Sequence, residues 1–224
     1  MDRYRTPGTV PKFFNPAAPI HVTRANLPHW EQEGTTYFVT FRLVDSLPQQ
    51  KLARWRADRE QWLDAHPEPL GDEEWAEYHE RFSAALEAWL DQAHGSCVLR
   101  LPQCRGAVTN ALEHFAGERY LLHDLAIAAN HVHVLTTPLG DHCLSDILHS
   151  WKSFTAKRIV GVPEASRRLV GWWQRLRDRR GQGPSPVCQR PVWQKESYDH
   201  IVRSSAALGY ITQYIRAHPS WTPT

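Results

Sequence analysis

Cysteine is scarce in this chain. Its four residues among 224 stand far apart, at Cys97, Cys104, Cys143 and Cys188. No Cys-x-x-Cys pair is present, although that is the spacing that structural zinc sites use. Four widely spaced thiols also do not match the dense disulfide framework of small secreted proteins. A metal site in this protein must therefore draw on other side chains.

Long apolar runs are missing as well. No segment approaches the length of about 20 residues that a membrane-spanning helix needs. The N-terminus, with Asp2, Arg3 and Arg5, has no hydrophobic stretch typical of a signal peptide. A glycine-rich phosphate loop is also absent. These absences predict a cytoplasmic protein that spans no membrane and binds no nucleotide through a Walker-type loop.

Neither basic nor acidic residues are in large excess in this chain. The formal net charge is +2, from 26 basic and 24 acidic residues, so bulk charge does not indicate a nucleic-acid-binding protein. The distribution is uneven, because residues 60–91 are rich in Asp and Glu while residues 152–180 are rich in Lys and Arg. The basic segment fits a phosphate-binding face and, equally, the solvated face of a helix.

The order of periodic segments predicts one domain with an insertion. Residues 1–20 are proline-rich and are expected to form an irregular arm, and residues 21–224 to form a single domain with a helical insertion at about 45–100. Hydrophobic periodicity predicts strands at 35–44, 120–128, 131–136 and 192–197, and helices at 47–66, 73–94, 104–116, 144–160, 167–179 and 205–218. This mixed order indicates an α+β fold and not a Rossmann sheet.

The predicted strand that begins at His131 contains the motif His131-Val132-His133. Because side chains alternate across a strand, both imidazoles would project from one face, with Val132 behind them. Two neutral imidazoles on one rigid face can bind one divalent metal ion. A His-x-His pair alone is more often an ordinary surface feature, so the pair needs a partner elsewhere in the chain.

The predicted C-terminal helix supplies such a partner. Tyr214 and His218 are four residues apart, which places a phenol and an imidazole on one face of the helix. Ile211 and Ile215 belong to its apolar face, and Pro219 ends it. Both side chains could therefore address the same metal ion as the His pair.

With these motifs the chain resembles the single-tyrosine HUH transposases, named after their His-hydrophobic-His motif, and in particular the REP-associated tyrosine transposases. The resemblance covers most of the chain and depends on the order and spacing of several short segments. These are Tyr37–Arg42, Asn130–Leu135, Leu148–Thr155, Val192–Gln194, Tyr198–Arg203, Tyr214-Ile215 and His218-Pro219. Their combination is far more specific than the His pair alone.

The resemblance implies a role for each matching residue. His131 and His133 would bind a divalent metal ion, and Tyr214 would be the nucleophile. His218 stands where relatives commonly carry Asn or Gln as a third ligand, and imidazole is at least as good a ligand. The family implies Mg²⁺ or Mn²⁺, whereas histidine ligation by itself favours a softer ion such as zinc. The fold would be a ferredoxin-like antiparallel sheet with helices on one face and the His pair on a central strand.

The implied activity is cleavage and transfer of single-stranded DNA beside a hairpin, through a 5′-phosphotyrosine intermediate. The expected partner is single-stranded or hairpin DNA, at REP-like palindromes or transposon ends, and the expected assembly is a monomer or a homodimer. The residues expected to contact DNA are Lys152, Trp151, Lys157, Arg203 and Tyr210. At helical spacing, however, a residue such as Trp151 more often belongs to a hydrophobic core.

Several alternatives stay open at this point. Tyr210, one turn before Tyr214, is a second possible nucleophile, and His200 is a weaker candidate ligand. A domesticated DNA-binding module with the same fold would bind without cutting, and an unrelated metallohydrolase would use the histidines without a tyrosine. The complete set of His131, His133, Tyr214 and His218 favours the enzyme, because a lineage released from catalysis should lose at least one of them.

Overall fold

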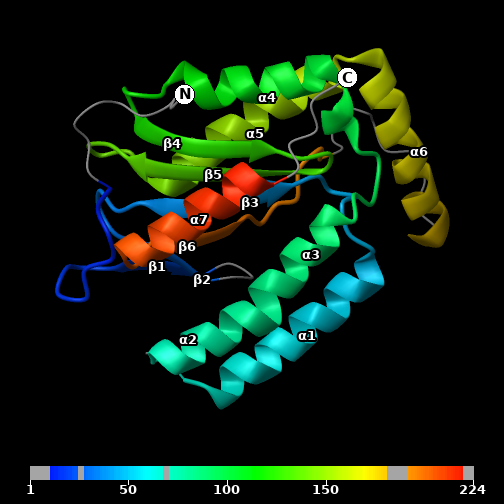
Figure 1. Ribbon diagram of the computed structural model, residues 1–224. Helices are drawn as coiled ribbons and strands as arrows, with labels where there is room; N and C mark the ends of the chain where they lie inside the picture. Colours follow the sequence, from blue (N-terminus) through cyan, green and yellow to red (C-terminus); the bar gives the residue numbers. More distant parts are fainter. Residues whose placement is uncertain (1–10, 25–27, 68–70, 181–190, 219–224) are drawn as a thin grey trace.

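A four-stranded antiparallel sheet forms the centre of the protein, in a computed structural model that describes residues 11–24, 28–67, 71–180 and 191–218 (Figure 1). The strands lie in the spatial order β4-β5-β3-β6. Their bounds are β3 (Tyr37–Arg42), β4 (Tyr120–Ile127), β5 (His131–Pro138) and β6 (Tyr198–Ile201). A separate antiparallel ribbon consists of β1 (His21–Arg24) and β2 (Pro28–Glu31).

Helices make up most of the remaining regular structure. They are α1 (Gln49–Ala65), α2 (Asp72–Tyr78), α3 (Ala85–Asp91), α4 (Pro102–His114), α5 (Leu144–Val160), α6 (Pro163–Arg180) and α7 (Ser205–Ala217). A π-helical segment, His79–Ala84, joins α2 to α3, so that the two helices run on as one. Within the described parts of the chain, no helix has both the length and the apolar character needed to cross a membrane.

The sheet and its connections follow the ferredoxin-like pattern. Apart from the insertion that contains α1 to α3, and apart from α6, the chain order is β3, α4, β4, β5, α5 and β6, which is a βαββαβ unit. The two inner strands are β5 and β3, and they pair through all six residues of β3, from Tyr37 opposite Thr136 to Arg42 opposite His131. The predicted α+β fold is thereby confirmed, and the His pair does lie on a central strand.

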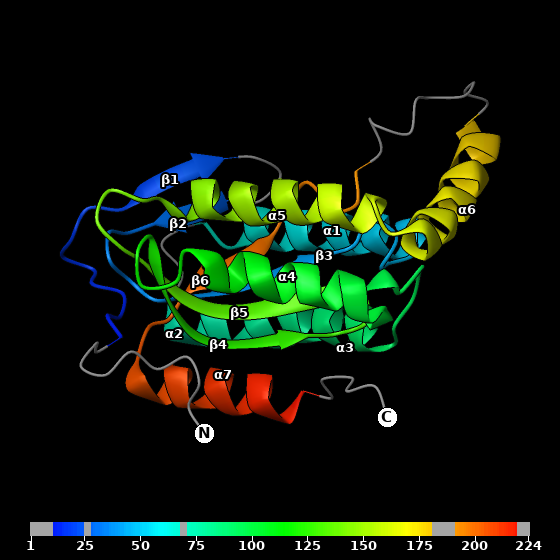
Figure 2. The same cartoon turned by 90° about the horizontal axis from the view of Figure 1, so that it is seen from above.

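Helices cover both faces of the sheet, and this corrects the expectation of helices on one face. Val132 and Val134 of β5 point into the larger core beneath α4 and α5. Leu135 points the other way and packs with Ile211 and Ile215 of α7. Figure 2 shows α4 and α5 on one side of the sheet and α7 on the other. Since all eight residues of β5 are buried, this strand needs cover on both sides.

The expected helical insertion is present and has a small core of its own. α1 runs beside the continuous helix α2–α3, and the two form a hairpin that projects from the sheet (Figure 1). Trp55, Trp62, Phe82, Leu86 and Leu90 are buried together between them. The insertion therefore packs as a unit, and its aromatic residues anchor it.

Some element bounds differ from the sequence-based prediction. The predicted strand 192–197 makes only an isolated bridge between Trp193 and Leu43, and β6 begins at Tyr198. The ribbon of β1 and β2 was not predicted, because its residues show no apolar alternation. Ser204 is the N-cap of α7, where its Oγ accepts a hydrogen bond from the Ala207 N–H at 3.1 Å. Pro219, which was expected to end the last helix, lies outside the described residues.

Two buried isoleucines hold α7 on the sheet, and replacing one should destabilise the protein. We expect Ile215→Ala to lower the free energy of unfolding by about 2–5 kcal/mol, because it leaves a cavity against the sheet. Gln213→Ala, on the exposed side of the same helix, should change it by no more than about 0.5 kcal/mol. Urea unfolding followed by tryptophan fluorescence measures both values. Equal effects of the two changes would contradict this account of how α7 is held.

Candidate metal centre and tyrosine nucleophile

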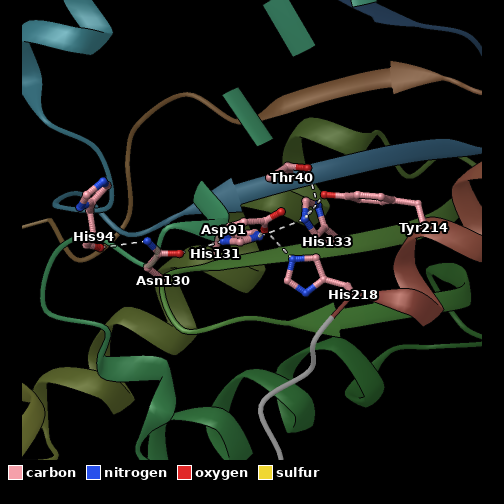
Figure 3. Close-up of polar contacts among 8 residues, drawn as sticks. All are labelled: Thr40, Asp91, His94, Asn130, His131, His133, Tyr214 and His218. Atoms are coloured by element: carbon pink, nitrogen blue, oxygen red, sulfur yellow. Dashed lines mark hydrogen bonds and ion pairs between the residues drawn. The ribbon is translucent and has the colours of Figure 1, made fainter. Parts of the chain in front are cut away.

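The two histidines of β5 meet at their outer nitrogens on the face of the sheet that α7 covers (Figure 3). His131 Nε2 lies 3.0 Å from His133 Nε2, and both side chains are fully buried. Their shared direction follows from the alternation of side chains along β5, with Val132 in the opposite core. The sequence-based prediction that both imidazoles face one way is therefore confirmed.

Hydrogen bonds to the inner nitrogens fix the orientation of both rings. His131 Nδ1 lies 2.8 Å from Asn130 Oδ1, and the Asn130 amide in turn donates to the His94 carbonyl at 2.9 Å. His133 Nδ1 lies 2.8 Å from Thr40 Oγ1 on the neighbouring strand. Because an amide oxygen can only accept, His131 carries its proton on Nδ1, and its Nε2 presents a lone pair. Metal-binding histidines are commonly oriented by partners of this kind.

Burial keeps these imidazoles neutral. It lowers the pKa of His131 to about 3, and the neighbouring His218 lowers it further, whereas Asp91 opposes the shift. The pKa of His133 is also held well below its ordinary value, first by burial and then by His131. Neutral imidazole is the form that binds metal. With its proton on Nδ1, His131 accepts a hydrogen bond at Nε2 from His133 Nε2 at 3.0 Å, and a cation that binds both nitrogens would replace the shared proton.

The C-terminal end of α7 brings the third histidine to the same place. His218 is buried, its ring centre lies 5.2 Å from those of His131 and His133, and potential ligand atoms of all three lie within 4.8 Å of one another. Within the described residues, His218 Nδ1 is buried and has no hydrogen-bond partner. These three buried histidines could hold a metal ion.

A carboxylate that the sequence did not point to completes the cluster. Asp91, at the end of α3, accepts a hydrogen bond from His218 Nε2 at 2.9 Å and lies 3.8 Å from His131 Nε2. The hydrogen bond from His218 is the main reason why the pKa of Asp91 is lowered. Carboxylate oxygen is a preferred ligand of Mg²⁺ and Mn²⁺. With Asp91 included, the donor set therefore suits these harder ions better than three imidazoles alone.

Tyr214 points its hydroxyl group at this cluster. Tyr214 Oη lies 3.3 Å from His133 Nε2, and the phenol is also hydrogen-bonded to the Glu87 side chain. Its pKa is raised well above the ordinary value of 10, first by burial and then by the negative charges of Glu87 and Asp91. The hydroxyl is therefore protonated at neutral pH and would need a proton acceptor in order to act as a nucleophile.

The residues expected to contact DNA are divided between the two faces. Trp151 is 2% exposed in the core beneath α5, where its indole N–H donates to Tyr120 Oη at 2.9 Å. Lys152 donates to the carbonyls of Gln194 and Lys195 at 3.0 and 2.9 Å, so its ammonium group holds that loop. Lys157 is exposed on the same helix. The structure therefore places these three residues across the sheet from the histidines.

The other two predicted DNA contacts lie on α7 or just before it. Tyr210 is 73% exposed on α7, one turn before Tyr214. Arg203 is exposed just after β6, with its guanidinium group 4.9 Å from the centre of the Phe14 ring. His200 of β6 stacks edge-on against Phe38 and is not part of the three-histidine cluster. Of the predicted contacts, only Tyr210 thus neighbours the proposed nucleophile along α7.

No protein-family model and no curated protein matches this chain. Among solved structures, it is similar to a REP-associated tyrosine transposase bound to a REP hairpin, at 12% identity and a TM-score of 0.41, over 88% of this chain and 73% of that one. It is also similar to a transposase candidate from Deinococcus radiodurans, at 16% identity and a TM-score of 0.29, over 84% and 92% of the two chains.

Removing one histidine should weaken metal binding. We expect His218→Ala to reduce the affinity for Mn²⁺ at least about 10-fold, since loss of even an outer partner of a metal ligand costs that much. His218→Asn, which keeps a ligand atom, should lose less. His142→Ala, at an exposed position, is the control. Calorimetric titration of the purified proteins gives the affinities, and equal affinities for all four proteins would contradict a metal site at this cluster.

The buried histidines also predict how stability depends on pH. Without metal, the unfolded chain binds protons below pH 6.5, while His131 stays neutral in the folded protein down to about pH 3. Stability should therefore fall as the pH drops through this window, by up to about 1.4 kcal/mol per pH unit for each such imidazole. Urea unfolding at several pH values, in the presence of a chelator, measures the slope. His131→Gln should flatten it and the exposed-site control His142→Gln should not; equal slopes would refute this origin of the acid sensitivity.

Proposed function

We propose that this protein is a metal-dependent single-strand DNA endonuclease and strand transferase that works through a covalent 5′-phosphotyrosine intermediate. The observation that supports it most directly is the position of Tyr214 Oη, 3.3 Å from His133 Nε2 at the edge of the three-histidine cluster. A phenol of this kind has no packing role that requires its oxygen to face a buried cluster of ligand atoms. The arrangement instead puts a nucleophile beside a site for a cation.

The reaction proceeds by exchange of one phosphodiester bond for another. Tyr214 Oη forms a bond to phosphorus, the bond to the 3′ oxygen breaks, and the 3′ end leaves as a hydroxyl group after it takes up a proton. A later attack by that 3′-OH, or by another strand's 3′-OH, reverses the step and releases Tyr214. Because the energy of the bond is kept in the phosphotyrosine, the cycle needs no nucleotide cofactor.

The residues that would hold the divalent ion are His131, His133 and His218, with Asp91 as an added oxygen ligand. When bound, such an ion neutralises charge on the phosphate oxygens and helps to orient the phosphate for in-line attack. The chain's own contribution is to position the nucleophile. α7 carries Tyr214, and His218 is the C-cap residue of the same helix, so one helix sets the distance between the attacking oxygen and the cluster.

The proposal that the substrate is DNA depends on the resemblance of the sequence motifs to those of the REP-associated tyrosine transposases. The site supports it through Tyr210, whose largely exposed ring on α7 is available for stacking with a base. We propose single-stranded or hairpin DNA as the partner and Mg²⁺ or Mn²⁺ as the ion, since the carboxylate of Asp91 favours these hard cations.

A covalent adduct with DNA tests this function. We expect the purified protein to form a denaturation-resistant adduct with labelled hairpin-bearing single-stranded DNA when Mn²⁺ or Mg²⁺ is present. Tyr214→Phe should lose the adduct completely, because it removes the attacking oxygen, whereas Tyr210→Phe should still form it. Denaturing gel electrophoresis separates the adduct from free DNA.

The other outcomes distinguish the alternatives. Cleavage that persists in Tyr214→Phe without an adduct would identify a metallohydrolase that uses the histidines alone. Binding without cleavage, across a broad set of hairpins, would identify a non-cutting DNA-binding module. An adduct that is lost in Tyr210→Phe and kept in Tyr214→Phe would assign the nucleophile to Tyr210.

A further inference from the structure

The helical insertion reaches the candidate site through one face of its second helix. Ser83, Glu87 and Asp91 follow each other at intervals of four residues along the π-helical segment and α3, which places them on one side. Ser83 Oγ is hydrogen-bonded to Tyr198 Oη of β6, Glu87 to Tyr214, and Asp91 to His218. The insertion therefore contacts the sheet, the tyrosine and the histidine cluster in turn.

The Tyr214 hydroxyl has partners on two sides. One is His133 Nε2, at 3.3 Å, and the other is the Glu87 carboxylate, which accepts the phenolic hydrogen. A cation bound at the histidine cluster would use the lone pair on His133 Nε2, so that nitrogen could no longer accept a proton. Glu87 would then be the partner that can take the proton from Tyr214.

We infer that Glu87 is a catalytic residue that accepts the proton of Tyr214 as the tyrosine attacks DNA. This inference depends on the proposed function. As the bond from Tyr214 Oη to phosphorus forms, the phenolic proton passes to the Glu87 carboxylate. The bond to the 3′ oxygen breaks with its electron pair, and that oxygen takes a proton from water. In the reverse step, the protonated Glu87 returns its proton to the departing Tyr214 oxygen.

The surroundings of Glu87 suit an acceptor that works near neutral pH. The groups that act on it are Asp91 on its own helix, Tyr214 and His218 at the end of α7, and Tyr198 on β6. Burial, followed by the charge of Asp91, raises the pKa of Glu87 to about 7. General bases are most effective when their pKa lies near the working pH. A divalent cation at the nearby cluster would lower this pKa and favour the carboxylate.

Asp91 does not compete for this role, because it faces the histidines. Its carboxylate oxygen lies 2.9 Å from His218 Nε2 and 3.8 Å from His131 Nε2. Of the two carboxylates of α3, Asp91 thus contacts the histidine cluster and Glu87 contacts Tyr214. The insertion supplies a proton acceptor as well as a possible ligand, although it lies far from both motifs in the sequence.

Glu87→Gln tests the inference, because it keeps the size and hydrogen-bonding ability of the side chain but cannot accept the proton. With full-length protein, hairpin-bearing single-stranded DNA and Mn²⁺, we expect adduct formation to be about 100-fold slower or more, the usual contribution of a general base. Glu80→Gln, an exposed position in the same insertion, is the matched control and should react like the unmodified protein. Glu87→Asp, which restores a carboxylate, should recover part of the rate.

The pH profile distinguishes proton transfer from a structural role. In the unmodified protein, the adduct rate should rise with pH as Glu87 loses its proton, and then level off. Glu87→Gln should lack this rise, while its Tm, Mn²⁺ affinity and DNA affinity stay unchanged. An unchanged rate and pH profile in Glu87→Gln would overturn the inference and leave the proposed function standing. A lower adduct rate in Glu87→Gln that comes with a loss of Mn²⁺ affinity or of folding would likewise overturn the inference, because the role of Glu87 would then be structural. No adduct in the unmodified protein would refute the proposed function and the inference together.

Discussion

The burial of two uncharged imidazoles inside the sheet is the constraint on which the rest of the site depends. His131 and His133 are fully buried on a central strand, where an imidazolium would lose its hydration. Thr40 and Asn130 satisfy their inner nitrogens and leave the outer nitrogens to face each other. A pair of this kind has little value as hydrophobic packing. The polar atoms that close around it, from α7 and from the insertion, are the groups that a cation and a nucleophile require.

The two faces of the sheet differ in role: the face beneath α4 and α5 is a structural core, and the face beneath α7 carries the histidines. Beneath α4 and α5, a network of aromatic and polar side chains holds the strands together. Trp193 donates to Thr155 Oγ1 at 2.8 Å, and Lys152 fixes the chain just after Trp193. Two of the segments that resemble the transposase family, Leu148–Thr155 and Val192–Gln194, are therefore each other's partners. Their pairing supports the sheet that presents the histidines, and burial of Lys152 lowers its pKa to about 8.

The acidic insertion puts negative charge next to a site proposed to hold a cation and a phosphate. A bound divalent ion would balance the charges of Glu87 and Asp91, whereas in its absence Asp91 is stabilised by its hydrogen bond with His218. Burial of Glu87 beside Asp91 is unfavourable for the carboxylate form. Natural proteins accept such local costs mainly where they serve a function. The insertion is thus more than a packing appendage, since its charged face is directed at Tyr214 and His218.

The sequence by itself determined the helices and three strands of the central sheet, the placement of His131 and His133 on one face, and their partnership with Tyr214 and His218 at the last helix. These features follow from local periodicity and from short spacings, which a single element enforces. It did not determine which face α7 covers, that Trp151 and Lys152 serve the opposite core, or that Glu87 and Asp91 reach the site. Those depend on contacts between residues far apart in the chain, such as Asp91 with His218, for which the sequence carries no periodic signal. Only the packing of the helices and of the insertion against the sheet decided them.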